Sequence, residues 1–174
     1  MIFLRNALLI GTLAMLTAVA SAESAPKLSL RDLNGQTQKL SSLRGNIVVL
    51  NFWATWCEPC QEELPRLSKL SQSYAGRNTR FVAVSIDAAK DREKIEPLLH
   101  RLHVDLDVWT GADVDTLEKF GLGDVVPGTM VIDEKGQIIR RVMGEARDED
   151  VRTALDWLVQ GRSGPAPALL LKRY

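Results

Sequence analysis

The cysteine pair Cys57 and Cys60 constrains this chain most, because these are its only two cysteines and just two residues separate them. The pair follows a nearly continuous apolar run, Asn46–Trp53, whose β-branched residues are typical of a strand covered on both faces. From Cys57 to about Gly76 large apolar residues recur every three to four positions, which indicates a helix. The sequence therefore predicts a cysteine pair at the junction of a buried strand and a helix.

The remaining segments alternate between strand-like and helix-like patterns. Asn34-Gly35 is typical of a hairpin turn, so we expect an N-terminal β-hairpin around it. This order predicts an α/β fold in which helices cover a β-sheet. The expected strands are Leu28–Asp32, Thr37–Leu40, Asn46–Trp53, Arg80–Ile86, Leu106–Trp109, Thr129–Ile132 and Gln137–Met143, and the later helices are Asp91–Leu102, Asp113–Gly121 and Asp148–Gln160.

Residues 1–22 have the pattern of a secretory signal peptide. Arg5 precedes the apolar stretch Ala7–Ala20, and Ala20-Ser21-Ala22 has the small-x-small form that a signal peptidase accepts. A membrane-spanning helix needs about 20 apolar residues, so the shorter run favours cleavage near Ala22, with an uncleaved membrane anchor as the alternative. In both cases we expect the protein in the periplasm or on the extracytoplasmic face of the membrane.

The length and charge of the chain limit its domains and partners. Residues 23–160 have the size of one domain with its own core, and we expect a monomer. Residues 161–174 are expected to form a flexible C-terminal tail, or else a docking segment for a partner. The 22 basic residues balance 22 acidic ones without a basic stripe, so no nucleic-acid partner is expected.

The spacing of the cysteines favours redox chemistry over a structural role. Two cysteines in an exported protein usually form a disulfide, but a bond across a two-residue gap removes little entropy from the unfolded chain. Half a zinc site is another possibility, with His100 and His103 as the second half, but 40 residues separate the pairs, whereas zinc-finger spacing is about a dozen. We therefore expect no metal and no cofactor beyond a redox-active Cys57–Cys60 disulfide.

The start of a helix predicts different roles for the two thiols. Unpaired N–H groups and the helix dipole favour a thiolate at Cys57, the expected nucleophile, while Cys60 is one turn further and resolves the mixed disulfide. Pro59 costs little in a first helical turn, and the negative charge of Glu58 opposes the thiolate. A less stable thiolate makes a stronger reductant, so Glu58 and Pro59 are predicted to tune the pair towards electron donation.

Glu63 is the candidate for proton transfer. It follows Cys60 by three residues and so lies on the same helix face, where its carboxylate could take the proton that Cys60 must lose. The alternative is an ordinary solvated carboxylate on the helix. Its neighbour Glu62 is rotated off that face.

The segment Asn51–Cys60, together with Glu63 and Pro65, closely resembles the TlpA/ResA group of thioredoxin-like proteins. The likeness extends over about Leu28–Leu158, and its second landmark, Val126–Asp133, is similar to the cis-proline loop of that family. The resemblance implies that Pro127 is cis and faces the cysteines. Trp56, Val126 and Pro127 would then line the groove for a substrate strand.

The resemblance also implies a thioredoxin fold, with a central mixed β-sheet flanked by helices and an inserted strand-helix element, which we place at Asp87–Leu106. It implies a thiol:disulfide oxidoreductase that takes electrons from a membrane donor of the DsbD/CcdA type. Protein substrates would be apocytochrome c, in cytochrome c biogenesis, or copper-site proteins. Two departures matter: Asn51 stands where thioredoxin has a buried aspartate, and Gly128 where the group often has threonine.

Other functions remain open for the same residues. A disulfide-introducing oxidase would use the same cysteines in the opposite direction. A periplasmic copper chaperone would bind metal through them, although the copper-delivering relatives normally show Cys-x-x-x-Cys with a distant histidine. A thiol peroxidase is disfavoured because Thr55 precedes Cys57 by only two residues, unlike the Pro-x-x-x-Thr-x-x-Cys pattern of that class.

Overall fold

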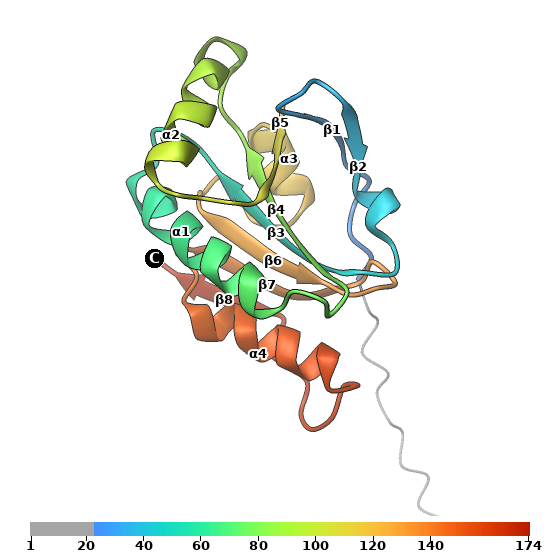
Figure 1. The fold of residues 1–174 in the computed structure, drawn as a ribbon. Helices are drawn as coiled ribbons and strands as arrows, with labels where there is room; N and C mark the ends of the chain where they lie inside the picture. The colour runs from blue at the N-terminus through green and yellow to red at the C-terminus, as the bar shows by residue number, and fades with distance from the viewer. Residues whose placement is uncertain (1–22) are drawn as a thin grey trace, which may run out of the picture.

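A computed structural model describes residues 23–174 of the chain (Figure 1). The predicted signal peptide or membrane anchor, with its cleavage site near Ala22, lies outside these described residues. Within them, no helix has the length and apolar character needed to cross a membrane.

Eight strands of residues 23–174 form one mixed sheet in the order β2-β1-β5-β4-β3-β6-β7-β8. The strands are β1 (Ser29–Asp32), β2 (Thr37–Lys39), β3 (Ile47–Trp53), β4 (Thr79–Ser85), β5 (Asp107–Thr110), β6 (Gly128–Ile132), β7 (Ile138–Gly144) and β8 (Leu170–Arg173). The helices are α1 (Glu58–Ser73), α2 (Ile95–Arg101), α3 (Val114–Lys119) and α4 (Asp148–Val159), with 3₁₀ turns η1 (Leu40–Leu43) and η2 (Ala89–Lys94). The expected α/β thioredoxin fold is thereby confirmed, including the N-terminal hairpin β1–β2.

Strand β3 lies at the centre, and its end leads into residues 54–57, here called the redox loop because they connect β3 to the cysteine pair. It runs parallel to β4, with Val49 opposite Phe81, and antiparallel to β6, with Leu50 opposite Met130. All seven of its residues are buried, which is why its sequence is apolar without alternation. The prediction of a strand covered on both faces is confirmed.

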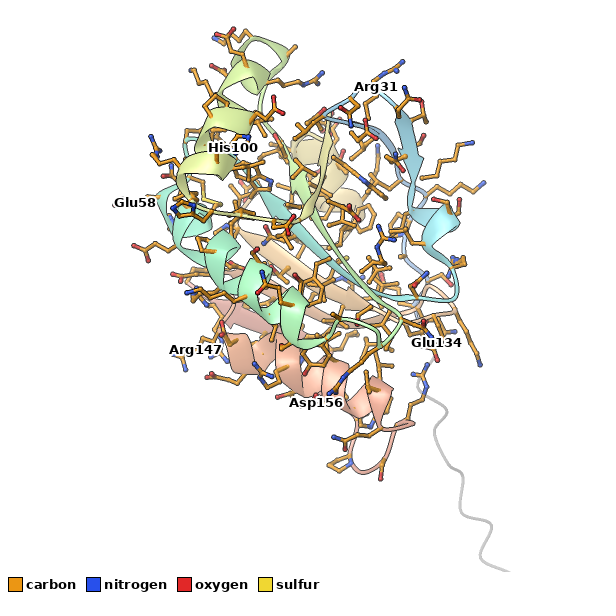
Figure 2. All side chains as sticks on the ribbon, viewed as in Figure 1. Arg31, Glu58, His100, Glu134, Arg147 and Asp156 are labelled. Atoms are coloured by element: carbon orange, nitrogen blue, oxygen red, sulfur yellow. A yellow bond between two sulfur atoms is a disulfide. The ribbon has the colours of Figure 1, made fainter. Side chains whose placement is uncertain are left out.

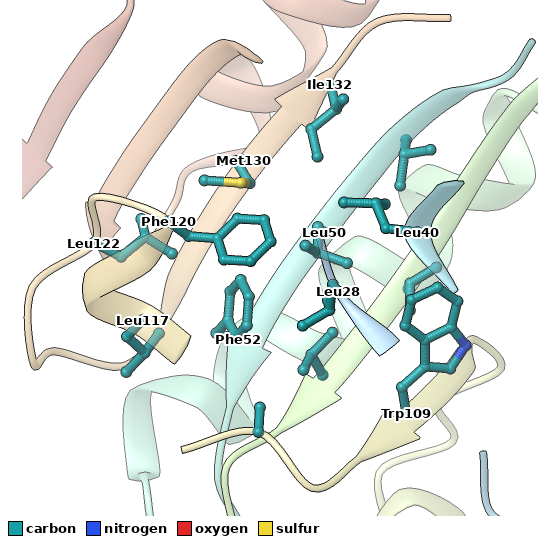
Figure 3. Packing of buried hydrophobic residues seen from close by; sticks show 14 of the residues in the cluster. Leu28, Leu40, Leu50, Phe52, Trp109, Leu117, Phe120, Leu122, Met130 and Ile132 are labelled. Carbon is teal, nitrogen blue, oxygen red and sulfur yellow. The ribbon is translucent and has the colours of Figure 1, made fainter. Parts of the chain in front are cut away.

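Successive side chains of β3 enter cores on opposite faces of the sheet. Val49 packs with Leu67 of α1 and Leu155 of α4, the two helices that cover one face in Figure 1. Phe52 packs on the other face, where its ring lies 5.3 Å from that of Phe120, just after α3 (Figure 3). Each such buried side chain contributes about 1.5–3 kcal/mol, so β3 is held firmly from both sides.

The element inserted between β4 and α3 differs in detail from the prediction. Residues 89–94 form η2 and α-helix begins only at Ile95, so the helix expected over Asp91–Leu102 is divided in two. The expected insertion, Asp87–Leu106, contains η2 and α2, and its strand β5 follows at Asp107. Buried Ile95, Leu98 and Leu99 hold α2 against the core that contains the cysteines.

The C-terminal tail is part of the sheet, so the prediction of a flexible tail was wrong for residues 170–173. Strand β8 pairs in parallel with β7, and the fold thus extends beyond residue 160. Arg173 donates to both oxygens of the buried Asp150, over 2.5 and 2.9 Å. Gly144 allows the close approach, since a Cβ there would come within 2.7 Å of the Arg173 carbonyl oxygen. These contacts join distant residues and leave no local pattern in the sequence.

Candidate active site

The two cysteines form a disulfide at the start of α1, and they differ in access. Cys57 is the N-cap residue, its Sγ accepts a hydrogen bond from the Cys60 N–H over 3.2 Å, and it keeps 5% of its surface exposed. Cys60 lies in the first turn and is fully buried. Of the two residues only Cys57 keeps any surface that a partner could contact, and it lies at the positive end of the helix dipole.

The residues next to the cysteines in sequence, Trp56, Glu58 and Pro59, lie at or just before the start of α1. Pro59 is in the first turn of α1, where a missing N–H costs little. Glu58 is exposed on the surface of the same turn (Figure 2). Trp56 is 67% exposed and borders a hollow of about 820 Å³ whose far wall is formed by η2 and α2. The inserted element thus forms one side of the hollow beside Trp56.

The loop before β6 brings Val126 to the cysteine pair. The Val126–Pro127 peptide bond is cis, and Val126 packs against the cluster that contains Cys57 and Cys60. The Pro127 carbonyl accepts a hydrogen bond from the Gly144 N–H over 3.0 Å. Gly128 follows, and a Cβ there would lie 3.1 Å from a methyl group of Leu122, so the departure from threonine matches the space available.

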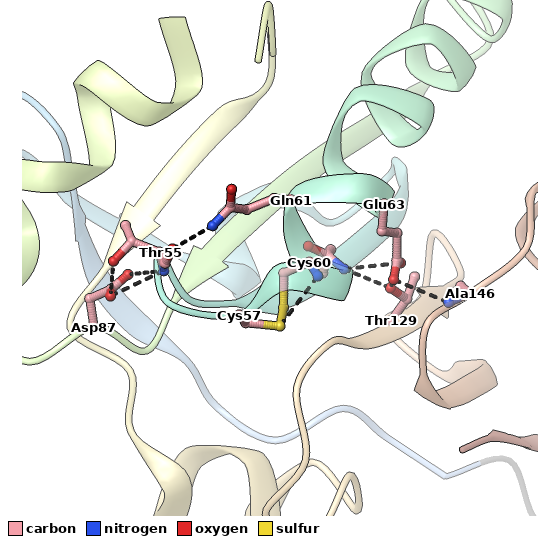
Figure 4. Close-up of a disulfide and its surroundings, with 9 residues drawn as sticks. Thr55, Cys57, Cys60, Gln61, Glu63, Asp87, Thr129 and Ala146 are labelled. Atoms are coloured by element: carbon pink, nitrogen blue, oxygen red, sulfur yellow. Dashed lines mark hydrogen bonds between the residues drawn. A yellow bond between two sulfur atoms is a disulfide. The ribbon is translucent and has the colours of Figure 1, made fainter. Parts of the chain in front are cut away.

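Glu63 is buried beneath the pair, and three donors reach its carboxylate. Oε1 accepts from the Thr129 hydroxyl over 2.6 Å and from the Asn51 amide over 3.2 Å, while Oε2 accepts from the Ala146 N–H over 3.1 Å (Figure 4). The same Asn51 amide donates to Thr129 over 2.8 Å. Asn51 therefore orients the buried carboxylate from β3, the strand that leads to the redox loop.

Burial raises the pKa of Glu63 from 4.5 to about 7. The hydrogen bonds from Thr129 and Ala146 and the charge of Arg66 oppose this rise, and the charge of Glu145 adds to it. Arg66 itself donates to Glu145 and to the Ala146 carbonyl oxygen, which limits its pull on Glu63. A carboxyl group with a pKa about 7 can both take up and release a proton near neutral pH, unlike a solvated glutamate.

Sequence reasoning missed the residue that holds the redox loop from behind. Asp87 is buried just after β4, and its carboxylate accepts hydrogen bonds from Thr55, two residues before Cys57 (Figure 4). Its only trace in the sequence is an aspartate two residues beyond an apolar strand, a position that is also ordinary for a solvated residue.

The histidines proposed as half of a metal site lie on or beside α2. His100 is on the exposed face of the helix (Figure 2), and His103 follows its end. Within residues 23–174, no three or more His, Cys, Asp or Glu side chains form a group that could hold a metal ion.

Comparison with known proteins places the chain in a family. The AhpC/TSA family profile matches residues 22–141. The chain is 31% identical over 140 residues to the thiol-disulfide oxidoreductase ResA of Geobacillus thermodenitrificans, covering 80% of this chain and 79% of ResA. It is 32% identical over 143 residues to the thioredoxin-like protein YneN of Bacillus subtilis, covering 79% and 80%.

Solved structures agree with these relatives. A thiol:disulfide interchange protein DsbE of Chlorobium tepidum has a TM-score of 0.68 at 26% identity, covering 82% of this chain and 97% of that one. A thioredoxin of Neisseria meningitidis has a TM-score of 0.67 at 28% identity, covering 82% and 93%. Together with the disulfide at the start of α1, these matches show that the chain belongs to the AhpC/TSA family as a thioredoxin-like thiol-disulfide oxidoreductase of the ResA type.

Proposed function

We propose that this protein is an exported reductant of protein disulfides. The observation that carries the proposal is the pairing of a reachable Cys57 with a buried Cys60 and the buried carboxyl of Glu63 on the next turn of α1. The disulfide itself is the redox group, and no other cofactor takes part.

The reaction has two exchange steps. The Cys57 thiolate attacks one sulfur of the substrate disulfide, which forms a mixed disulfide and releases the other substrate sulfur as a thiolate. Cys60 then loses its proton to Glu63 and attacks the sulfur of Cys57, which releases the second substrate thiolate. Two electrons pass to the substrate, and the enzyme is left with the Cys57–Cys60 disulfide.

The groove beside Cys57 orients the substrate for the first step. Trp56, Val126 and Pro127 would form this groove, and an extended substrate strand would lie against them. Glu58 and Pro59 adjust the stability of the thiolate, and the charge of Glu58 favours the reducing direction.

Partners follow from this chemistry and from the relatives. ResA of Geobacillus thermodenitrificans is named a thiol-disulfide oxidoreductase, and its likeness supports protein disulfides as substrates here. We infer substrates among apocytochrome c or copper-site proteins, and re-reduction by a membrane donor of the DsbD/CcdA type. The protein acts as a monomer in the periplasm or at the extracytoplasmic face, delivered there by residues 1–22.

Trapping with Cys60→Ser tests the proposal. This variant cannot resolve mixed disulfides, so its partners stay bound through Cys57 and can be identified by mass spectrometry. Cys57→Ser is the matched control and should trap nothing. A cytochrome or a copper-site protein among the trapped partners would support the assignment, and an absence of trapped partners in an exporting host would overturn it.

The reduction potential tests the direction of electron flow. Equilibration with glutathione should give a value near that of thioredoxin, about −270 mV. A value above about −150 mV would instead make the protein an oxidant that introduces disulfides. Tight stoichiometric copper binding without insulin reduction, lost in either cysteine-to-serine variant, would make it a copper chaperone.

A further inference from the structure

A second buried carboxylate, Asp87, lies behind the redox loop on the side away from Glu63. It follows β4 and is only 1% exposed. Across residues 23–174 it forms no ion pair. A buried carboxylate without a paired cation is costly, so its hydrogen bonds must account for its presence.

These hydrogen bonds come from Thr55 and Ser85. The Thr55 N–H lies 3.1 and 3.0 Å from the two carboxylate oxygens, and the Thr55 hydroxyl donates to Oδ1 over 2.7 Å. The Ser85 hydroxyl donates to Oδ2 over 2.9 Å and accepts from the Asp87 N–H over 3.0 Å. Ser85 thus orients the carboxylate, and the carboxylate holds both donors of Thr55.

The remaining polar group of Thr55 is held from the opposite side. Its carbonyl oxygen accepts from the Gln61 side chain over 2.8 Å, and Gln61 belongs to the first turn of α1 (Figure 4). The Cys57 N–H donates to the Ala54 carbonyl over 3.2 Å within the same loop. A shift of Thr55 would therefore break contacts to β4 and α1 together, and would move Cys57, two residues away.

The geometry points to Asp87 as a positioning residue for the redox reaction, one that fixes the loop presenting Cys57 through its hydrogen bonds to Thr55. The inference rests on the proposed role of Cys57 as the attacking thiol. Among the described residues Asp87 makes no hydrogen bond to either cysteine, and its hydrogen bonds to the redox loop all come from Thr55. Displacement of a reacting atom by about 1 Å can cost up to a hundredfold in rate.

Two variants of the full chain test this role. Asp87→Ala removes the acceptor, and Thr55→Val removes one donor while it keeps Asp87. The control is Asp133→Ala, because Asp133 is equally buried; it accepts from the backbone N–H groups of Lys135 and Gln137 and, unlike Asp87, also pairs with Arg162 over 2.8 Å. Asp133 follows β6, which is antiparallel to β3, so it lies at the sheet edge opposite the cysteines.

Three measurements separate positioning from mere stability: the melting temperature, the pH dependence of alkylation of reduced Cys57 by iodoacetamide, and kcat and KM for insulin reduction. We expect Asp87→Ala and Thr55→Val to lower kcat roughly tenfold or more, with KM changed less than about twofold. Both should shift the pH midpoint of alkylation. Asp133→Ala should lower the melting temperature and leave the other two readouts unchanged.

The conservative variant Asp87→Asn gives a further readout. It keeps an oxygen acceptor for Thr55, so kcat should recover towards the wild-type value. It removes a negative charge near the loop, where Glu58 remains, so Cys57 should be alkylated at lower pH than in wild type.

The proposal fails if Asp87→Ala resembles Asp133→Ala, with a lower melting temperature and unchanged kcat and alkylation profile. If Asp87→Ala does not fold, the same measurements on Thr55→Val test the proposal. Alkylation needs no protein substrate, so it tests the role of Asp87 even if the wild-type protein proves not to reduce disulfides.

Discussion

The Thr129 hydroxyl donates to Oε1 of Glu63 over 2.6 Å, and this contact joins the strand after the cis-proline loop to the helix of the cysteines. Thr129 is the second residue of β6 and follows the loop of Val126 and Pro127. The cis-proline loop and the buried carboxyl group of Glu63 are therefore linked through one short segment, residues 126–129. A movement of the loop would also change the environment of Glu63.

Glu63→Gln should slow the resolving step, because the amide cannot take the Cys60 proton. We expect a decrease of roughly a hundredfold in the rate at which the mixed disulfide decays in single-turnover experiments. The exposed neighbour Glu62→Gln is the control and should behave as wild type. Equal rates in both variants would leave Glu63 with a structural role alone.

Thr129→Val should raise the pKa of Glu63 above its value of about 7, because the variant removes a donor that stabilises the carboxylate. The pH midpoint of the resolving step should therefore move to higher pH. Adding Thr129→Val to Glu63→Gln should produce no such shift. A midpoint that moves in the double variant as well would assign the titration to another group.

The burial of Glu63 should make the protein less stable as pH rises. Its pKa is about 7 in the folded state against 4.5 ordinarily, so between these values the folded state binds more protons than the unfolded state. The free energy of unfolding should fall by roughly 3 kcal/mol between pH 4.5 and 7, and stay lower above pH 7. Urea titrations at several pH values should show this fall in the free energy of unfolding for wild type and not for Glu63→Gln. The same pH dependence in both proteins would contradict the prediction.

Arg173→Ala should destabilise the fold, because Asp150 would remain buried without its two donated hydrogen bonds. We expect a loss of roughly 1–3 kcal/mol in the free energy of unfolding. The exposed neighbour Lys172→Ala is the control. The double variant Asp150→Ala/Arg173→Ala should lose less free energy of unfolding than the sum of the losses in its two single variants. Strictly additive losses would show that Arg173 and Asp150 do not stabilise the fold as a pair.

Local patterns predicted the centre of the molecule well. The unbroken apolar run of β3 and the helical spacing after Cys57 each depend on neighbours in the chain, so they are visible in the sequence. The position of Glu63 on the helix of the cysteines was predicted in the same way, because Glu63 follows Cys60 by three residues.

Long-range contacts explain what the sequence left hidden. The burial of Glu63 depends on Thr129 and Ala146, and the function inferred for Asp87 depends on Thr55, 32 residues earlier. Strand β8 looked like a loose tail because its partners, β7 and Asp150, lie far along the chain. A contact between residues far apart in the chain produces no local pattern in the sequence around either residue.

The placement of β8 also affects the order in which parts of the sheet can form during synthesis. Helix α1 and the central strands β3 and β4 are made early, but the outer edge of the sheet beside β7 is completed only by residues 170–173. Until they emerge, β7 presents an open edge and Asp150 lacks its arginine, a state open to mispairing with other chains. A strand made more than a hundred residues after the cysteines thus covers the edge of the sheet in which they lie.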